Sequence, residues 1–256
     1  MMKLAFMSSV CPKMTLAELI STGKRHGYEG IEFRPEWGHK HTIELELSAA
    51  GRKEAAQVLA DSGLEGCCLS PGVWFAREED GARDEELEKL YKFIELAAET
   101  QIGRIRVFGD PLPNMGSGRR SANYEAQADY LGRAAQRAGE AGIKLVLETH
   151  TNFRACDAGE VLYRAGYPAA LWINWHLAHC LNHGEGVDEA YRHVKGRVDH
   201  AHFNVEIEEE QPHVERQLAL LRDDGFDGFF SLEVINPDDP EDVLTRHVDA
   251  WRKMGK

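Results

Sequence analysis

Acidic and imidazole side chains gather at the ends of four apolar segments in the second half of the chain. Six of the twelve histidines lie between residues 176 and 202. The polar ends of the four segments are Glu148 and His150, His176 and His179, His200 and His202, and Glu233. A buried carboxylate is costly, and two that face one centre repel each other unless a cation or a proton lies between them. Neutral imidazoles beside them are good metal ligands.

Two interpretations of this pattern are open. Glu148 and Glu233 could pair with arginine or lysine, with the histidines as ordinary core residues. For any one of these residues alone, that simpler interpretation is preferable. Because acidic or imidazole groups end four consecutive segments, we favour a divalent metal site.

The segments that position these groups alternate regularly with helical patterns. Eight short apolar segments are typical of strands, and they are spaced by helix-length stretches. They are Leu4–Met7, Gly30–Phe33, Gly66–Leu69, Arg104–Phe108, Lys144–Glu148, Leu171–His176, Val198–Phe203 and Phe229–Val234. Strands separated by helices are parallel, with right-handed crossovers. The sequence therefore predicts a (β/α)8 TIM barrel of the α/β class, with an open doubly wound sheet as the alternative.

Local signals mark the ends of eight predicted helices. Thr15 and Glu18 form a capping box for the first, which Gly27 ends, and Ser48 caps a second that ends at Gly63. The other helical patterns cover 85–100 and 124–141, or begin at Asp157, Asp188, His213 and the pair Asp239–Pro240. We find no composition break, so residues 1–256 are expected to form a single domain.

Composition excludes several classes of partner. The chain has 256 residues, 43 acidic and 30 basic, and a formal net charge of −13. This balance argues against binding to nucleic acid and to anionic membranes, both of which need clustered basic residues. No apolar run approaches the length of a membrane span, and residues 1–10 do not have the pattern of a signal peptide. Five scattered cysteines suggest reduced thiols, and hence a cytoplasmic protein.

Five motifs resemble those of the xylose-isomerase-like barrels, a family of sugar isomerases, ketose 3-epimerases, inosose dehydratases and the second family of apurinic endonucleases. The resemblance covers nearly the whole chain. The motifs are GYEGIEFRPE (27–36), IRVFGD (105–110), LVLETH (145–150), VDHAHF (198–203) and FFSLEV (229–234). The resemblance implies that Glu148, His202 and Glu233 bind a divalent metal. By analogy with the epimerases, it also implies that Glu148 and Glu233 move protons as catalytic residues through an enediolate.

One position departs from the family pattern. Relatives usually end the sixth strand with Trp-Asp-x-x-His, whose Asp binds metal, whereas this chain has Trp175-His176-Leu177-Ala178-His179. His176 therefore stands at the fourth ligand position, and His179 stands where relatives contact substrate. If His176 ligates, two carboxylates and two imidazoles favour manganese, cobalt, iron or zinc over magnesium.

The resemblance implies a metal-dependent enzyme acting on a small carbohydrate. The first hypothesis is an isomerase or epimerase of a sugar, polyol or hydroxy-ketone, which removes a proton next to a carbonyl. The alternatives are a dehydratase or lyase acting on a keto-sugar or inosose, and a noncatalytic barrel that binds a sugar or a metal. Besides His179, the candidate substrate-binding residues are His150 and Arg34. An endonuclease is disfavoured by the net charge, and a homo-oligomer is possible.

Three other features have weaker interpretations. Arg34 could instead pair with Glu32 at the rim of the barrel, and Arg104 or Arg106 could form a structural ion pair. The Gly- and Arg-rich segment 116–120 is more typical of a mobile lid than of a phosphate-binding loop.

Overall fold

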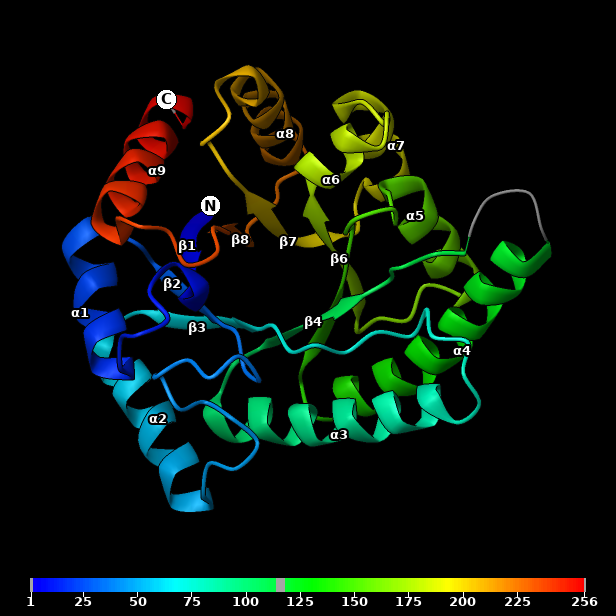
Figure 1. Cartoon of the computed structure of the whole chain (residues 1–256), viewed down its shortest axis with the longest axis horizontal. Helices are drawn as coiled ribbons and strands as arrows, with labels where there is room; N and C mark the ends of the chain where they lie inside the picture. Colours follow the sequence, from blue (N-terminus) through cyan, green and yellow to red (C-terminus); the bar gives the residue numbers. More distant parts are fainter. Residues whose placement is uncertain (1, 114–117, 256) are drawn as a thin grey trace.

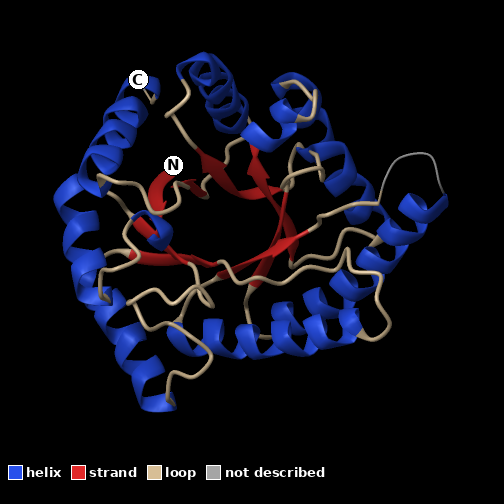
Figure 2. Cartoon of the chain, in the orientation of Figure 1, coloured by secondary structure: helices blue, strands red, loops and turns tan. Residues whose placement is uncertain are grey.

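The structure is a closed barrel of eight parallel strands surrounded by helices (Figures 1 and 2). It is a computed structural model that describes residues 2–113 and 118–255. Each strand pairs with the next in chain order, and β8 closes the ring on β1, where Phe6 lies opposite Leu232. The strands are β1 (Lys3–Met7), β2 (Gly30–Phe33), β3 (Glu65–Leu69), β4 (Arg104–Phe108), β5 (Lys144–Glu148), β6 (Leu171–His176), β7 (Val198–Phe203) and β8 (Phe229–Leu232). The predicted (β/α)8 barrel is thus confirmed.

The helices form an outer layer around this ring, as Figure 2 shows. The described part of the chain contains α1 (Leu16–His26), α2 (Ala49–Ser62), α3 (Ala82–Thr100), α4 (Gly118–Glu140), α5 (Ala155–Arg164), α6 (Leu177–Asn182), α7 (Val187–Val194), α8 (Gln211–Asp223) and α9 (Pro240–Met254). Short 3-10 turns, η1 (Ser8–Val10) and η2 (Glu208–Glu210), follow β1 and β7. The capping box of Thr15 and Glu18 and the left-handed Gly27 are present as predicted.

The structure corrects the expected elements in two places. Strict alternation of eight helices is wrong, because the short helix α6 follows β6 directly and precedes α7. The last strand ends at Leu232 instead of Val234, so Glu233 lies just beyond it. Short helices of six residues are hard to distinguish from loops in a sequence, since they lack a full apolar repeat. Both corrections concern the end of the barrel where the polar groups lie.

The barrel interior is apolar at one end and polar at the other. Ala5, Cys67, Val146 and Phe229 pack together inside the ring, in a cluster separate from the larger core between strands and helices. Side chains two residues apart point to the same face of a strand. The side chain of Glu148 therefore points into the barrel on the same face of β5 as that of Val146, and Glu148 is 1% exposed. The polar layer above this apolar floor is where function is expected in such barrels.

The segment predicted as a lid is only partly described. Residues 116 and 117 lie outside the described residues, and residues 118–120 begin α4. Arg119 pairs with Glu78 and Arg120 pairs with Asp157. These two arginines are therefore engaged in ion pairs with the protein itself.

Candidate metal centre

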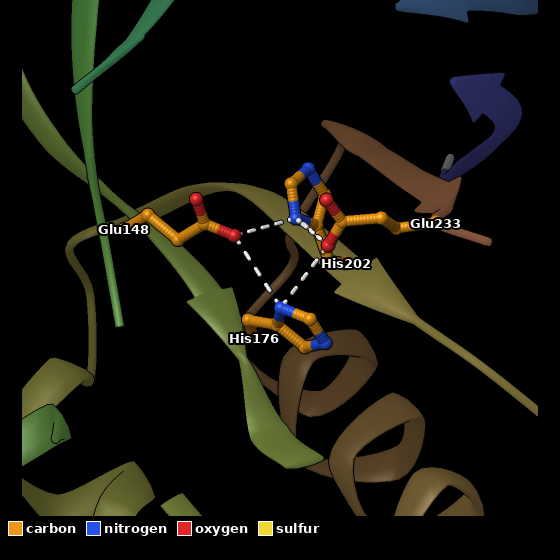
Figure 3. A group of neighbouring side chains, drawn as sticks. All are labelled: Glu148, His176, His202 and Glu233. Atoms are coloured by element: carbon orange, nitrogen blue, oxygen red, sulfur yellow. Dashed lines mark hydrogen bonds and ion pairs between the residues drawn. The ribbon is translucent and has the colours of Figure 1, made fainter. Parts of the chain in front are cut away.

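The four expected ligands converge on one point at the carboxyl end of the barrel (Figure 3). One ligand atom from each of Glu148, His176, His202 and Glu233 lies within 4.8 Å of all the others. His202 Nδ1 is 2.7 Å from Glu148 Oε1 and 3.2 Å from Glu233 Oε2. His176 Nδ1 is 3.3 Å from each of the same two oxygens. The two carboxylates thus point toward each other with both imidazoles between them.

The strand ends fix these side chains. Glu148 ends β5, His176 ends β6, His202 lies in β7, and Glu233 directly follows β8. The hydroxyl of Thr149 accepts a hydrogen bond from the His176 backbone N–H at 2.8 Å and donates one to the His176 carbonyl at 3.1 Å. This pair of bonds ties the ends of β5 and β6 together, so the Thr149 hydroxyl on the His176 backbone fixes the spacing of Glu148 and His176.

The charged groups of the centre shift one another's pKa values. Burial alone would raise the pKa of Glu148, but His202 and Arg106 hold it well below its usual range. Glu233 has a pKa of about 2, because the effect of His202 outweighs that of burial. Burial lowers the pKa of His202, yet Glu32, Glu148 and Glu233 together raise it well above the usual value. Without a metal, the proton on His202 and the guanidinium of Arg106 therefore compensate the facing carboxylates.

The residues fit a divalent cation. Two carboxylate oxygens and two imidazole nitrogens face one another from the ends of separate strands, which is a donor set suited to manganese, iron, cobalt or zinc. A cation would take over the charge that the His202 proton supplies, since metal binding requires the neutral imidazole. Glu148, His176, His202 and Glu233 are the residues that would hold it.

A third carboxylate, Glu32, supports His202 from the side away from the centre. Its oxygens lie 3.0 and 3.1 Å from His202 Nε2, and one is 2.9 Å from His200 Nε2. Ser70 Oγ also donates to Glu32. All four side chains are buried. Glu32 thus accepts a hydrogen bond from His202 Nε2 and orients the ring so that Nδ1 faces Glu148 and Glu233. Such a carboxylate partner is common for metal-bound histidines.

The expected pairing of Glu32 with Arg34 is wrong. Glu32 points into the barrel toward the histidines, whereas the Arg34 guanidinium lies over the Trp37 ring at 3.9 Å. The sequence did contain a signal for Glu32, because an acidic residue within the apolar strand GIEF needs a buried partner. Its partner, His200, also alternates with His202 along β7 and so shares its face of the strand.

We expect Glu32→Gln to weaken metal binding about 10- to 100-fold, because an amide is a poorer acceptor for the His202 Nε2–H group. Competition with a chromophoric chelator would measure the dissociation constant for zinc and manganese. The matched control is Glu65→Gln, which removes a carboxylate from an exposed position of β3. An affinity equal to that of the unaltered protein would show that Glu32 does not support the ligand.

His150 and His179 line the same end of the barrel. Their rings lie 4.6 Å apart, and the His179 ring lies 4.2 Å from that of His176. His150 Nδ1 is 2.9 Å from Asp110 Oδ1. Burial lowers the pKa of His150, but this hydrogen bond and the negative charges of Glu148 and Asp110 together raise it above its usual value. Burial and the neighbouring His176 and His150 lower the pKa of His179 to about 3. The centre thus has a neutral imidazole beside one that readily holds a proton.

The ion pair predicted for Arg104 or Arg106 is confirmed, and both arginines of β4 form one. Arg106 Nη1 lies 3.2 Å from Glu148 Oε2, and both side chains are buried. Arg104 instead pairs with Asp199 at 2.5 Å, a residue that also contacts Lys144. Only Arg106 therefore reaches the candidate centre, while Arg104 belongs to a structural cluster with Asp199.

The fold and this arrangement define a barrel with a buried cluster of glutamates and histidines at its carboxyl end that could hold a metal ion. The family model of the xylose isomerase-like TIM barrels matches residues 20–254. The chain belongs to that family. No curated protein matches it in sequence.

Several solved structures share the whole fold at low sequence identity. An L-ribulose 3-epimerase is 18% identical, with a TM-score of 0.79, and the match covers 100% of this chain and 94% of that one. A probable 3-DHS dehydratase from Bacillus anthracis is 18% identical, with a TM-score of 0.77 and coverage of 98% and 99%. A 3-keto-D-glucoside 4-epimerase from E. coli is 18% identical, with a TM-score of 0.77 and coverage of 99% and 99%. At this identity they establish the shared fold.

Among the described residues, no helix has the length and apolar character needed to cross a membrane. All five cysteines are free thiols.

Proposed function

We propose that the protein is a divalent-metal-dependent isomerase or epimerase of a sugar, polyol or related hydroxy-ketone. The observation that carries this proposal is the pair of glutamates, Glu148 and Glu233, that face one centre across two imidazoles. A structural relative is described as an L-ribulose 3-epimerase and another as a 3-keto-D-glucoside 4-epimerase, which supports sugar chemistry. A metal at this centre would polarise the substrate oxygens and favour loss of the adjacent proton.

The protein's own groups supply the proton transfers. Both glutamates have lowered pKa values and are therefore deprotonated at neutral pH. In epimerisation, one carboxylate takes the proton from the carbon next to the carbonyl and becomes protonated, and the other delivers to the opposite face a proton that it has first gained from solvent. Glu148 is held by Arg106 and is 1% exposed at its side chain, while Glu233 is 16% exposed. Glu233 is accordingly the group that can exchange its proton with solvent.

The imidazoles at the rim bind substrate in this proposal. His179 is neutral because of its low pKa, so it can donate to or accept from a substrate hydroxyl. His150 is oriented by Asp110, which fixes the nitrogen that faces the pocket. Arg34 completes the set of candidate substrate-binding residues.

Elimination is the second candidate reaction. His150, whose pKa is raised by its bond to Asp110, can hold a proton for a departing hydroxyl group. One of the structural relatives is described as a probable dehydratase. The proposed first step is the same in both reactions, and only the fate of the resulting carbanion differs.

The test is proton exchange in deuterated water. We expect the manganese-loaded protein to introduce deuterium next to the carbonyl of at least one member of a panel of ketoses, inososes and keto-sugar acids. NMR would detect the deuterium. A new epimer or isomer supports the first reaction, and an unsaturated product supports elimination. Lack of deuterium uptake across the panel would instead favour a noncatalytic binding protein.

A further inference from the structure

Two arginines at the carboxyl end of the barrel have buried nitrogen atoms without an acceptor. Nε of Arg34, and Nε and Nη1 of Arg106, have no hydrogen-bond partner among the described residues. Arg106 donates to the Ser70 carbonyl through Nη2 at 3.1 Å, and its Nη1 faces Glu148 without hydrogen-bond geometry. Buried donors in proteins nearly always have an acceptor. Arg106 Nη1 still has Glu148 as its ion-pair partner, so it is the Nε groups of Arg34 and Arg106 that point to an acceptor that the protein itself does not provide.

Both guanidinium groups are held by their flat faces. The Arg34 guanidinium carbon lies 3.9 Å from the centre of the Trp37 ring, and that of Arg106 lies 3.5 Å from the Phe108 ring. Stacking of this kind orients a guanidinium and leaves its in-plane N–H groups available. Those groups match the two oxygens of a carboxylate, which bind arginine side by side. Arg34 has no ion-pair partner within the described chain.

The charges near the centre favour an anion as that acceptor. Glu32, Glu148 and Glu233 carry one more charge than Arg34 and Arg106 together, so the side chains have one negative charge in excess. A divalent cation converts this to an excess of one positive charge among these groups when the ligand imidazoles of His176 and His202 are neutral. The two cations lie at the same end of the barrel, because Ser70, whose carbonyl accepts from Arg106, donates its backbone N–H to the carbonyl of Phe33, the residue before Arg34. A monoanionic ligand would neutralise the remaining charge.

The histidine at position 176 contributes to this balance. An aspartate there would cancel the excess positive charge, whereas the imidazole of His176 leaves it in place. Asp110, a further acidic side chain at this end of the barrel, is paired with His150 at 2.9 Å. The acidic turn Glu208–Glu210 follows β7 on the same side of the barrel and opposes a dianionic phosphate ester. A carboxylate fits these charges better than a phosphate.

We propose that the substrate of this centre is a keto-sugar acid or a related hydroxy-keto acid, whose carboxylate is bound by Arg34 with the support of Arg106. This inference rests on the proposed function and names its substrate class. Neutral ketoses of the same length would lack the group that these guanidiniums bind.

Matched pairs of ligands test the substrate class. Calorimetry on the manganese-loaded protein would compare hydroxypyruvate with dihydroxyacetone, D-fructuronate with D-fructose, and D-tagaturonate with D-tagatose. Each pair differs only by a carboxylate in place of a CH2OH group. We expect at least one acid to bind about 10-fold or more tightly than its neutral partner, as a charge-assisted hydrogen bond provides. Fructose 6-phosphate serves as the phosphate probe.

A carboxylate can also bind the metal directly. The variant Arg34→Met distinguishes binding of the carboxylate by the arginine from binding by the metal. Methionine keeps an apolar stem against Trp37, and thermal unfolding would verify the fold. We expect the preference for the acid to fall to within about threefold in this variant. The preference for the acid should persist in the control variant Arg216→Met, which removes a guanidinium that pairs with Asp188 on the outer helices. Arg34→Lys should retain part of the preference for the acid, because lysine keeps a positive charge at this position.

Three results would overturn the inference: no acid preferred in any pair, a preference that survives in Arg34→Met, or tighter binding of the phosphate ester. Failure of the proposed function has a different signature. Acids would then bind through Arg34 without deuterium exchange at the carbon next to the carbonyl. Conversely, exchange with neutral ketoses and no preference for acids would retain the reaction and reject the substrate class.

Discussion

Glu148→Gln and Glu233→Gln are each expected to lower turnover by about 1,000-fold or more, because glutamine cannot accept the proton that the proposed reaction removes. Each substitution also removes one carboxylate from the four groups that converge at the mouth of the barrel. The rate of proton exchange, measured by NMR at saturating manganese, gives the loss of turnover. Glu125→Gln is the matched control, since the Glu125 side chain is 72% exposed on α4 and, within residues 2–113 and 118–255, pairs only with Arg164.

The two variants should differ in stability. Glu148 is buried against Arg106, so Glu148→Gln leaves that cation without its acidic partner and should lower the free energy of unfolding by about 3 kcal/mol. Glu233→Gln should cost less, because Glu233 lies beyond the end of β8 and is partly exposed. Denaturant unfolding of the metal-free proteins measures the difference. Full activity in either variant would remove that glutamate from the proposed mechanism.

The barrel could be predicted because each strand is short, apolar and followed by a helix with its own end signals. Gly27 and Gly63 adopt the left-handed conformation that ends α1 and α2, which glycine reaches without strain. These are local signals, and they do not depend on distant parts of the chain. Helix α6 has no such signal, since it begins directly after His176 without a side-chain cap.

The centre could be predicted in part for a related reason. Parallel strands bring their carboxyl ends to one side of the barrel, so the residues at the ends of β5 to β8 must meet. The convergence of Glu148, His176, His202 and Glu233 follows from this topology. Whether these residues bind metal stays a prediction, because convergence alone does not identify the ligand.

The partners of Glu32 could not be read from the sequence. Its contacts with His200 and His202 join residues separated by 168 and 170 positions, and they depend on the tilt of strands across the barrel. A sequence pattern shows that Glu32 lies in an apolar strand, but it gives neither the depth of the side chain nor its neighbours. For the same reason the rim pairing of Glu32 with Arg34 was a reasonable expectation and is wrong.

His176→Asp should shift the metal preference toward harder ions, with the ratio of zinc affinity to magnesium affinity falling about 10-fold or more. The substitution replaces an imidazole nitrogen with a carboxylate oxygen, and it adds a negative charge beside Glu148 and Glu233. The fold should be retained, because the backbone bonds of His176 to Thr149 do not involve the imidazole. Chelator competition with each metal gives the two affinities.

His183→Asp is the matched control, since His183 is exposed at the end of α6 and should leave the ratio unchanged. An unchanged ratio in His176→Asp itself would show that His176 is not a ligand. The same variant also tests the charge argument for an acidic substrate. The added carboxylate cancels the excess positive charge, so the preference for D-fructuronate over D-fructose should weaken even though Arg34 is intact. A preference of full strength would mean that the local pairing with Arg34, and not the net charge of the centre, selects the acid.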